Sequence, residues 1–223
     1  MNTVVIVAGG EGRRMGSNIP KQYLELAGKS MILHTLDKFL QFDPEIKIVL
    51  VLAVEHQKYW EGIPAYQKPT REIIITSGGN TRYESVKNGL SHIENGVITG
   101  IHDAVRPFVS IGTIRRCYET AREQGSGIPV IEMDETIRRV GPENKSGNLD
   151  RSTLRRVQTP QVFRSEMIKK AYARSDDPSF TDDASVFESM YKRVSLVKGN
   201  IENIKITSPT DYKLALLLME SKR

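Results

Sequence analysis

The sequence predicts an α/β fold, specifically a Rossmann-like three-layer sandwich with a mainly parallel central sheet. Short β-rich segments alternate with amphipathic segments along most of the chain, which is the rhythm of βαβ units. Hydrophobic residues make up 39% of the 223 residues, which is enough for one domain to bury a core. We therefore expect a single domain over residues 1–223, with no internal repeat and no separating linker.

Four strand–helix pairs follow one another in the first half of the chain. The expected strands are residues 4–7, 48–54, 73–76 and 98–102, and the segments that follow them are 32–39, a polar stretch to 67, 83–93 and 111–124. The last segment has the clearest pattern, because Ile111, Ile114, Tyr118 and Ala121 recur at helical spacing. Ser110 stands where a helix N-cap is expected.

The second half closes with two short strands and a helix. We expect strands near residues 194–197 and 204–206. The closing helix has a capping serine at Ser208, a first-turn proline at Pro209 and an acid at Asp211. Ligands of parallel sheets bind beyond the carboxyl ends of the strands. The loops to search are therefore those after Val7, Thr76, His102 and Val130.

Residues 135–159 break the alternation and predict a projecting β-hairpin arm. Their centre is a polar turn rich in glycine and asparagine, and few large apolar residues flank it. A lone hairpin is marginal in water, so the arm packs either on its own domain or, as we favour, on a second subunit. Between residues 138 and 156, six basic residues stand against two acidic ones. The simpler alternative is that these charges form a solvated edge that discourages aggregation.

Composition and charge limit the class of protein. The single cysteine, Cys117, cannot form an internal disulfide, and the longest apolar run, residues 48–54, is far short of the about 20 residues that span a membrane. We expect a cytoplasmic protein with no membrane partner. The net charge of +5 is too small to indicate a nucleic-acid partner, but it is compatible with binding of a polyanionic small molecule.

A glycine-rich loop follows the first strand directly. Residues 8–16 contain three glycines in four positions, Gly9, Gly10 and Gly12, whose backbone N–H groups can form an anion-binding nest. Arg14 and Lys21 add fixed positive charge, so the loop suits a triphosphate. The alternative without a binding function is an ordinary glycine-rich turn whose arginine side chains are exposed to solvent.

Two familiar nucleotide motifs fail on spacing. A dinucleotide fingerprint that starts at Gly10 finds Met15 where its third glycine belongs. A Walker loop that ends at Lys29 finds Tyr23 where a glycine is needed.

Residues 8–16, followed by Pro20-Lys21-Gln22, resemble the signature loop of the sugar nucleotidyltransferases. The resemblance is closest to the 2-C-methyl-D-erythritol 4-phosphate cytidylyltransferase family of the non-mevalonate isoprenoid pathway. Five further segments agree in order: 78–86, 102–108, 158–161, 181–185 and 203–207. The resemblance spans residues 4–218. It implies that the phosphate of methylerythritol phosphate attacks the α-phosphorus of CTP in line, that pyrophosphate leaves, and that Mg²⁺ accompanies the triphosphate. Such chemistry needs positioning and charge more than a nucleophilic side chain.

The resemblance also implies roles for particular residues. Those implied to be catalytic are Arg14, Lys21 and Lys205. Those implied to bind CTP are Ala8, Gly9, Gly10, Gly12, Gly79, Asn80, Arg82 and Ser85. Those implied to surround the acceptor are Asp103, Arg106, Thr136, Arg151, Thr159 and Thr181, with Asp103 also a possible neighbour of the metal. Arg151 is implied to reach the acceptor site of the partner in a homodimer formed through residues 135–159.

Some of these residues have simpler readings, and the chain departs from the family pattern in places. An aspartate at a strand end is commonly a cap, and each threonine is commonly a turn or cap residue. Many relatives have aspartate where this chain has Asn80, although an amide can still hydrogen-bond a base or a ribose. Val7 and Gly9 stand where a proline and an alanine are common.

Three other functions compete with this hypothesis. A ribitol-5-phosphate cytidylyltransferase shares the fold, CTP and several of the motifs, and differs only in its acceptor. A non-catalytic CTP sensor would bind CTP through the same loop. Arg14, Lys21 and Lys205 argue against it, because a protein that only binds CTP does not need positive charges that stabilise a transition state. A nucleic-acid-binding module lacks support, because the sequence shows no strands in which basic and aromatic residues alternate and no pairs of cysteine or histidine at the spacing of zinc ligands.

Overall fold

A twisted sheet forms the centre of the computed structural model, which describes residues 1–9, 19–64, 67–70, 72–174 and 180–221. Its strands are β1 (Asn2–Ala8), β4 (Lys47–Leu52), β5 (Ile73–Ser77), β6 (Ile98–Asp103), β7 (Ser126–Glu132), β10 (Arg155–Val157), β11 (Gln161–Arg164) and β12 (Leu196–Lys198). They are ordered β10-β7-β11-β6-β1-β4-β5, and β12 pairs separately with β7. β6, β1, β4 and β5 are mutually parallel, whereas β11 runs antiparallel to β6 and β7.

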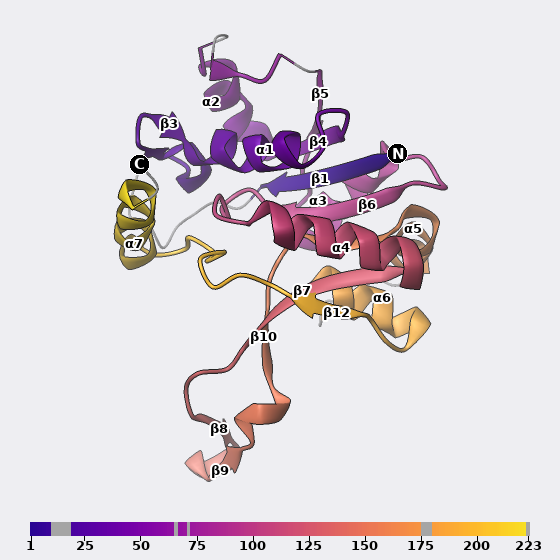
Figure 1. Ribbon diagram of the computed structural model, residues 1–223, viewed down its shortest axis with the longest axis vertical. Coiled ribbons are helices and arrows are strands. Elements are labelled where there is room, and N and C mark those ends of the chain that lie inside the picture. Colours follow the sequence, from indigo (N-terminus) through magenta and orange to yellow (C-terminus); the bar gives the residue numbers. More distant parts are fainter. Residues whose placement is uncertain (10–18, 65–66, 71, 175–179, 222–223) are drawn as a thin grey trace.

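Helices cover both faces of this sheet (Figure 1). One face carries α1 (Met31–Phe42) and α4 (Ile111–Gln124), and the other carries α3 (Arg82–Ser91), α5 (Ser165–Arg174) and α6 (Asp183–Tyr191). The short helix α2 (Gln57–Glu61) and the two-stranded pair β2 (Glu25–Leu26) and β3 (Lys29–Ser30) lie outside these layers, as does α7 (Pro209–Glu220). The three-layer arrangement confirms the α/β class expected from the sequence.

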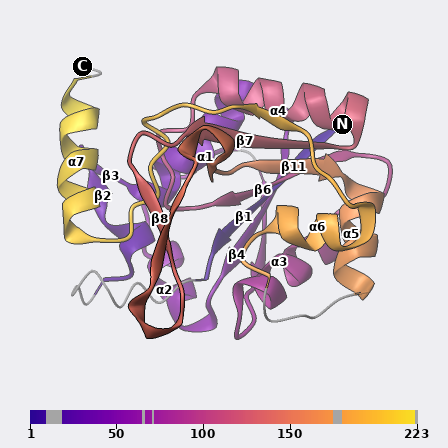
Figure 2. The ribbon, with the colours of Figure 1, turned by 90° about the horizontal axis from the view of Figure 1, so that it is seen from below.

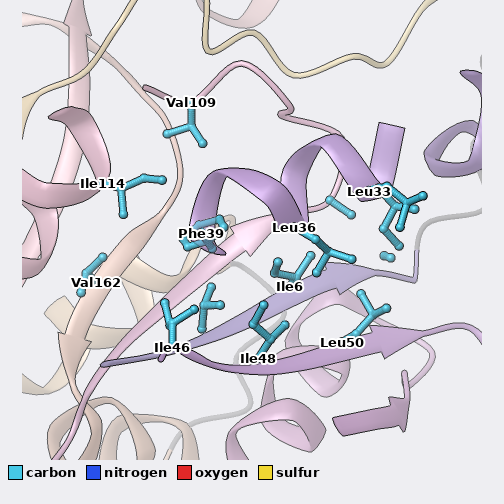
Figure 3. Close-up of a cluster of buried hydrophobic side chains, with 14 of the residues drawn as sticks. Ile6, Leu33, Leu36, Phe39, Ile46, Ile48, Leu50, Val109, Ile114 and Val162 are labelled. Carbon is cyan, nitrogen blue, oxygen red and sulfur yellow. The ribbon is translucent and has the colours of Figure 1, made fainter. Parts of the chain in front are cut away.

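The core explains why the central strands read as continuous apolar runs. Successive residues of β1 point to opposite faces, so Ile6 packs beneath α1 while Val5 packs beneath α3. In Figure 3, Leu36 and Phe39 of α1 lie over the sheet, and Ile6 is among the strand residues below them. All four side chains are fully buried, and burial of each contributes about 1.5–3 kcal/mol.

Two helix starts form as their sequences predict. The Ser110 hydroxyl accepts a hydrogen bond from the Thr113 N–H at 3.1 Å and so caps α4. At the start of α7, Ser208 and Asp211 each accept from the other's backbone N–H in a capping box, with Pro209 in the first turn. Both helix starts could be predicted from the sequence because their capping hydrogen bonds join residues only three positions apart.

The hairpin consists of β8 (Ile137–Val140) and β9 (Ser146–Leu149) and is shorter than the sequence suggested. β10, which we expected to belong to the arm, pairs antiparallel with β7 in the central sheet. The hairpin extends away from the three layers beyond β7 and β10 (Figure 1), and Figure 2 views the molecule from the side to which it points. Every side chain from 137 to 149 is exposed or partly exposed, so the hairpin buries little against its own chain.

Two expectations near the carboxyl end need correction. The strand expected at 194–197 forms slightly later, as β12. Residues 204–206 form no strand: the segment is irregular, and the Ile206 N–H donates to the Val105 carbonyl at 3.0 Å. Its apolar character reflects instead the burial of Ile206 among Leu26, Phe108 and Ala215. In the described part of the chain, none of the helices has the length and apolar character needed to cross a membrane.

Candidate active site

A pocket of about 680 Å³ opens where the parallel strands end. Loops after β1, β4, β5 and β6 line it, which agrees with the rule that ligands bind beyond the carboxyl ends of parallel strands. Nine residues singled out from the sequence line it: Ala8, Gly9, Lys21, Gly79, Asn80, Arg82, Ser85, Asp103 and Lys205. The loop after Val130 does not, because β7 lies toward the other edge of the sheet and borders a separate pocket with Arg155 and Arg156.

The loop after β5 is held in shape by the first turn of α3. The Gly79 N–H donates to the Ser85 hydroxyl at 3.1 Å, and that hydroxyl donates to the Thr81 carbonyl at 2.9 Å. The Asn80 N–H donates to a Glu84 carboxylate oxygen at 2.7 Å. A Cβ at Gly79 would collide with the Glu84 side chain, so this position requires glycine. Ser85 and Glu84 therefore shape the loop.

Lys21 stands at the pocket because the residue after it is anchored. The Gln22 side chain is 1% exposed and donates to the Ala8 carbonyl at 2.8 Å. The same amide nitrogen lies 3.2 Å from His56 Nδ1, and the Tyr23 hydroxyl donates to the His56 carbonyl. These bonds tie the short turn Lys21–Tyr23 to the end of β1. The sequence pattern included Gln22 but gave it no role, since nothing local indicates its distant partners.

Asp103 ends β6 and lies at the base of the pocket, with only 6% of its surface exposed. Three cations surround its carboxylate. Oδ2 lies 3.1 Å from Lys205 Nζ and 3.2 Å from Arg106 Nε. Oδ1 lies 3.6 Å from Arg82 Nε. Burial alone would raise the pKa of Asp103, but these cations outweigh it and hold that pKa far below its usual range, so the carboxylate stays ionised.

The described residues do not fit a metal ion held by the protein. Among them, no group of three histidine, cysteine or acidic side chains could ligate one. Both carboxylate oxygens of Asp103 already face cations, which compete with a divalent ion for the same lone pairs. Asp103 therefore serves to arrange positive side chains around it.

Thr159 is not among the residues that line the pocket, and its expected place beside the acceptor stays a prediction. It is 5% exposed, and its hydroxyl accepts from the Asp103 N–H at 3.1 Å. The hydroxyl also lies 3.0 Å from His102 Nδ1, while His102 Nε2 lies 3.2 Å from the Arg106 carbonyl. Burial lowers the pKa of His102 to about 3, so the ring is neutral, with Nδ1 as acceptor and Nε2–H as donor. This network fixes the turn that carries Asp103 and Arg106.

Of the remaining predicted residues, those that the structure describes do not line the pocket. Thr136 and Arg151 are exposed on the arm, and Arg151 Nη1 donates to the Asp134 carbonyl at 2.7 Å. Thr181 is exposed just before α6. Arg106 does not line the pocket itself but contacts Asp103 and the Asn203 carbonyl. Gly10, Gly12 and Arg14 lie outside the described residues.

The described lining of the pocket holds three cations against the carboxylates of Glu55 and Asp103, and it offers little for covalent catalysis. Its cationic lining side chains come from three separate segments: Lys21, Arg82 and Lys205. Among the described lining residues, the hydroxyl groups are those of Thr81 and Ser85, and both are bonded to the loop backbone. Such a site can bind a polyphosphate and stabilise charge that moves between phosphate groups.

Comparison with known proteins agrees with this chemistry. The family model described as 2-C-methyl-D-erythritol 4-phosphate cytidylyltransferase matches residues 2–221. Proteins of that name from Bacteroides fragilis and Bacteroides thetaiotaomicron are 46% and 45% identical over 217 residues, which cover 97% of this chain and 99% of each relative.

Solved structures give the same result. The 4-diphosphocytidyl-2C-methyl-D-erythritol synthase of Anaerococcus prevotii superposes with a TM-score of 0.86 at 25% identity, over 99% of this chain and 96% of its own. The 2-C-methyl-D-erythritol 4-phosphate cytidylyltransferase of Francisella tularensis gives 0.79 at 31% identity, over 96% and 97%. With a matching family model over nearly its whole length, close relatives and a cationic pocket at the strand ends, this chain belongs to the 2-C-methyl-D-erythritol 4-phosphate cytidylyltransferase family.

Proposed function

We propose that this chain transfers CMP from CTP to 2-C-methyl-D-erythritol 4-phosphate and releases pyrophosphate. The observation that carries the proposal is the cluster of cations around Asp103 at the strand ends, in a chain whose relatives bear that activity as their name. The product would be 4-diphosphocytidyl-2-C-methyl-D-erythritol, an intermediate of non-mevalonate isoprenoid synthesis.

The reaction is an in-line displacement between phosphates. An oxygen of the acceptor phosphate forms a bond to the α-phosphorus of CTP, and the bond from that phosphorus to the β-phosphate oxygen breaks. The electron pair of the broken bond leaves with pyrophosphate. No side chain needs to act as a nucleophile, because the acceptor phosphate is itself the nucleophile. The residues of the pocket supply position and charge.

We assign Lys21 and Lys205, which both line the pocket, to opposite partners of this reaction. Lys21 follows the glycine loop and is assigned, with Arg14, to the triphosphate and the charge that develops on it. Lys205 is 41% exposed at its side chain, so it can leave Asp103 and contact a phosphate that enters the pocket. Arg106 stays in place because it also bonds the Asn203 carbonyl at 2.8 Å.

We assign Mg²⁺ to the nucleotide substrate, as Mg–CTP, because the triphosphate oxygens can supply the ligands that the described side chains do not. Mg²⁺ commonly binds through substrate phosphates and water in this way. The test is a titration of turnover with Mg²⁺ at fixed CTP: activity should follow the concentration of the Mg–CTP complex.

We also propose that the chain acts as one nucleotidyltransferase domain in the cytoplasm and forms a homodimer through its arm. The support is that the hairpin buries little against its own chain, although an isolated hairpin is marginal in water. Val140 on β8 is 63% exposed and offers apolar surface to a partner. In the dimer, Thr136 and Arg151 would complete the acceptor site of the other subunit. Light scattering should give the mass of two chains.

The deciding experiment is pyrophosphate release with Mg²⁺ and CTP, measured in parallel with methylerythritol 4-phosphate and with ribitol 5-phosphate. Release with the first acceptor alone is expected. Release with ribitol 5-phosphate alone would keep the mechanism and overturn the acceptor. Release with neither acceptor, despite CTP binding, would instead indicate a nucleotide sensor.

A further inference from the structure

Arg82 joins two carboxylates that belong to distant parts of the chain. Its Nη1 and Nη2 donate to the two oxygens of Asp183 at 2.9 and 2.7 Å, and its Nε lies 3.6 Å from Asp103 Oδ1. Asp183 is 101 residues away in sequence. All three guanidinium nitrogens thus face carboxylates, and the pair with Asp183 has the bidentate geometry in which arginine binds a carboxylate most strongly.

The Asp183 end of this bridge is fixed. Asp183 is fully buried at the start of α6, and the Tyr172 hydroxyl of α5 donates to its Oδ1 at 2.6 Å. Tyr172 in turn stacks on Tyr83, the residue after Arg82, with ring centroids 4.6 Å apart. A buried carboxylate is costly to separate from its cation, so Asp183 anchors the Arg82 side chain at the wall of the pocket.

The Asp103 end lies at the pocket, because Asp103 is one of its lining residues. Because Arg82 approaches Oδ1, the other oxygen of Asp103 is left for Arg106 and Lys205. Burial by itself would lower the pKa of Arg82, but Asp183 and Asp103 outweigh it and raise that pKa well above its usual value. The guanidinium therefore keeps its charge and its place between the two carboxylates.

We propose that Asp183 is a positioning residue of the active site: it holds Arg82, and through Arg82 it orients Asp103 and the cations that receive the acceptor phosphate. Arg82 then acts on the acceptor half of the pocket, in contrast to the CTP contact implied by the sequence. The inference rests on the proposed cytidylyl transfer for its kinetic test. Nothing local in the sequence pairs Asp183 with Arg82.

The kinetic test uses Asp183→Asn, which keeps the shape of the side chain and removes its charge. The specificity constant kcat/KM for methylerythritol phosphate should fall about tenfold or more, whereas the Kd of CTP should change less than about twofold. Asp37→Asn is the control, because it removes the carboxylate of an α1 residue from a partly exposed ion pair with Lys29 of β3. The control should leave both constants unchanged.

A double-mutant cycle separates positioning from a merely structural effect. If Asp183 acts through Asp103, Asp183→Asn should cost little further activity in an Asp103→Asn background. Additive losses, or equal losses in CTP binding and acceptor use, would overturn the proposal. If Asp183→Asn does not fold, Tyr172→Phe serves instead, because it removes the donor to Asp183 and keeps the ring stack. Tyr172→Phe should lower kcat/KM for methylerythritol phosphate by a smaller factor than Asp183→Asn, and it should likewise leave the Kd of CTP nearly unchanged.

A second readout does not depend on turnover. The Nε–H proton of Arg82, assigned by its loss in Arg82→Lys, should exchange slowly with water in NMR spectra of the full chain. Its exchange should become fast in both Asp183→Asn and Asp103→Asn. Fast exchange in the unaltered protein would contradict the bridge. If the chain turns over neither acceptor, the proposed function fails, and this measurement still decides whether Asp183 holds Arg82 against Asp103.

Discussion

The pocket at the strand ends and the β8–β9 hairpin arm both carry positive charge, but they hold it differently. At the pocket, Asp103 and Arg82 are fixed by partners from several elements, which include the buried Asp183 and, behind the lining, Arg106. On the arm, exposed side chains bond mainly within the hairpin, as Arg138 does with Ser146. The comparison shows that the chain fixes its charged pocket with its own buried partners, whereas the side chains of the arm stay exposed and have few partners outside the hairpin.

The largest expected effect belongs to the pocket. Lys21→Ala should lower kcat by about 10²–10³-fold, because it removes a charge directed at the triphosphate in the transition state. CTP binding, measured by calorimetry, should weaken much less. A loss confined to the Kd of CTP, with kcat unchanged, would mean that Lys21 only binds the nucleotide. Lys29→Ala is the control, since Lys29 lies on β3 and does not line the pocket.

The second prediction tests whether the arm acts on a partner subunit. Arg151→Ala should raise the KM for the acceptor about 10–100-fold, as expected for the loss of one charged hydrogen bond, and should leave the KM for CTP nearly unchanged. Arg138→Ala is the matched control, because it removes an exposed arginine of the same arm. Equal changes in both KM values, or the same effect from Arg138→Ala, would contradict a specific contact of Arg151 with the acceptor. Either result would mean that the arm affects activity only through its overall positive charge.

The third prediction concerns pH and the buried network beneath the pocket. The pKa of His102 is about 3 in the folded protein and about 6.5 when unfolded, so the unfolded chain binds more protons between these values. The contribution of His102 to stability is therefore present above about pH 6.5 and is lost as pH falls, by about 1.4 kcal/mol per pH unit.

Asp103, whose pKa is also lowered, adds to this loss only below about pH 4, where the unfolded carboxyl group takes up its proton. Denaturant unfolding at pH 7, 6 and 5 should show the fall in stability, and His102→Gln should flatten it. His92→Gln, an exposed substitution beside α3, should not. The same slope in all three proteins would exclude His102 as its source.

The smallest effect should come from Thr159→Val. This change removes the hydroxyl that receives the Asp103 N–H, at a cost of about 1–2 kcal/mol of stability and about fivefold in kcat/KM for the acceptor. Thr181→Val, at an exposed position, is the control for stability. A fall in activity without a fall in stability would indicate that Thr159 contacts the substrate after all.

Some features were predictable because they depend on near neighbours. The period of α4, its serine cap and the capping box of α7 are set within a few residues, so the sequence pattern located them. The loops after β1, β5 and β6 followed from the rule for parallel sheets. β10 was assigned to the wrong element because its pairing with β7 links residues more than 20 positions apart in sequence.

The sequence by itself determined the α/β class and the family suggested by six ordered motifs, and it predicts that the loop after β1 binds phosphate. Only the tertiary structure decided what each polar side chain does. It brought Asp183 to Arg82, bonded the Thr159 hydroxyl to the Asp103 N–H and set Lys205 against Asp103 from a segment without regular structure. The physical reason is that periodicity and capping act over one or two turns, whereas hydrogen bonds and ion pairs depend on distances that only the folded chain defines.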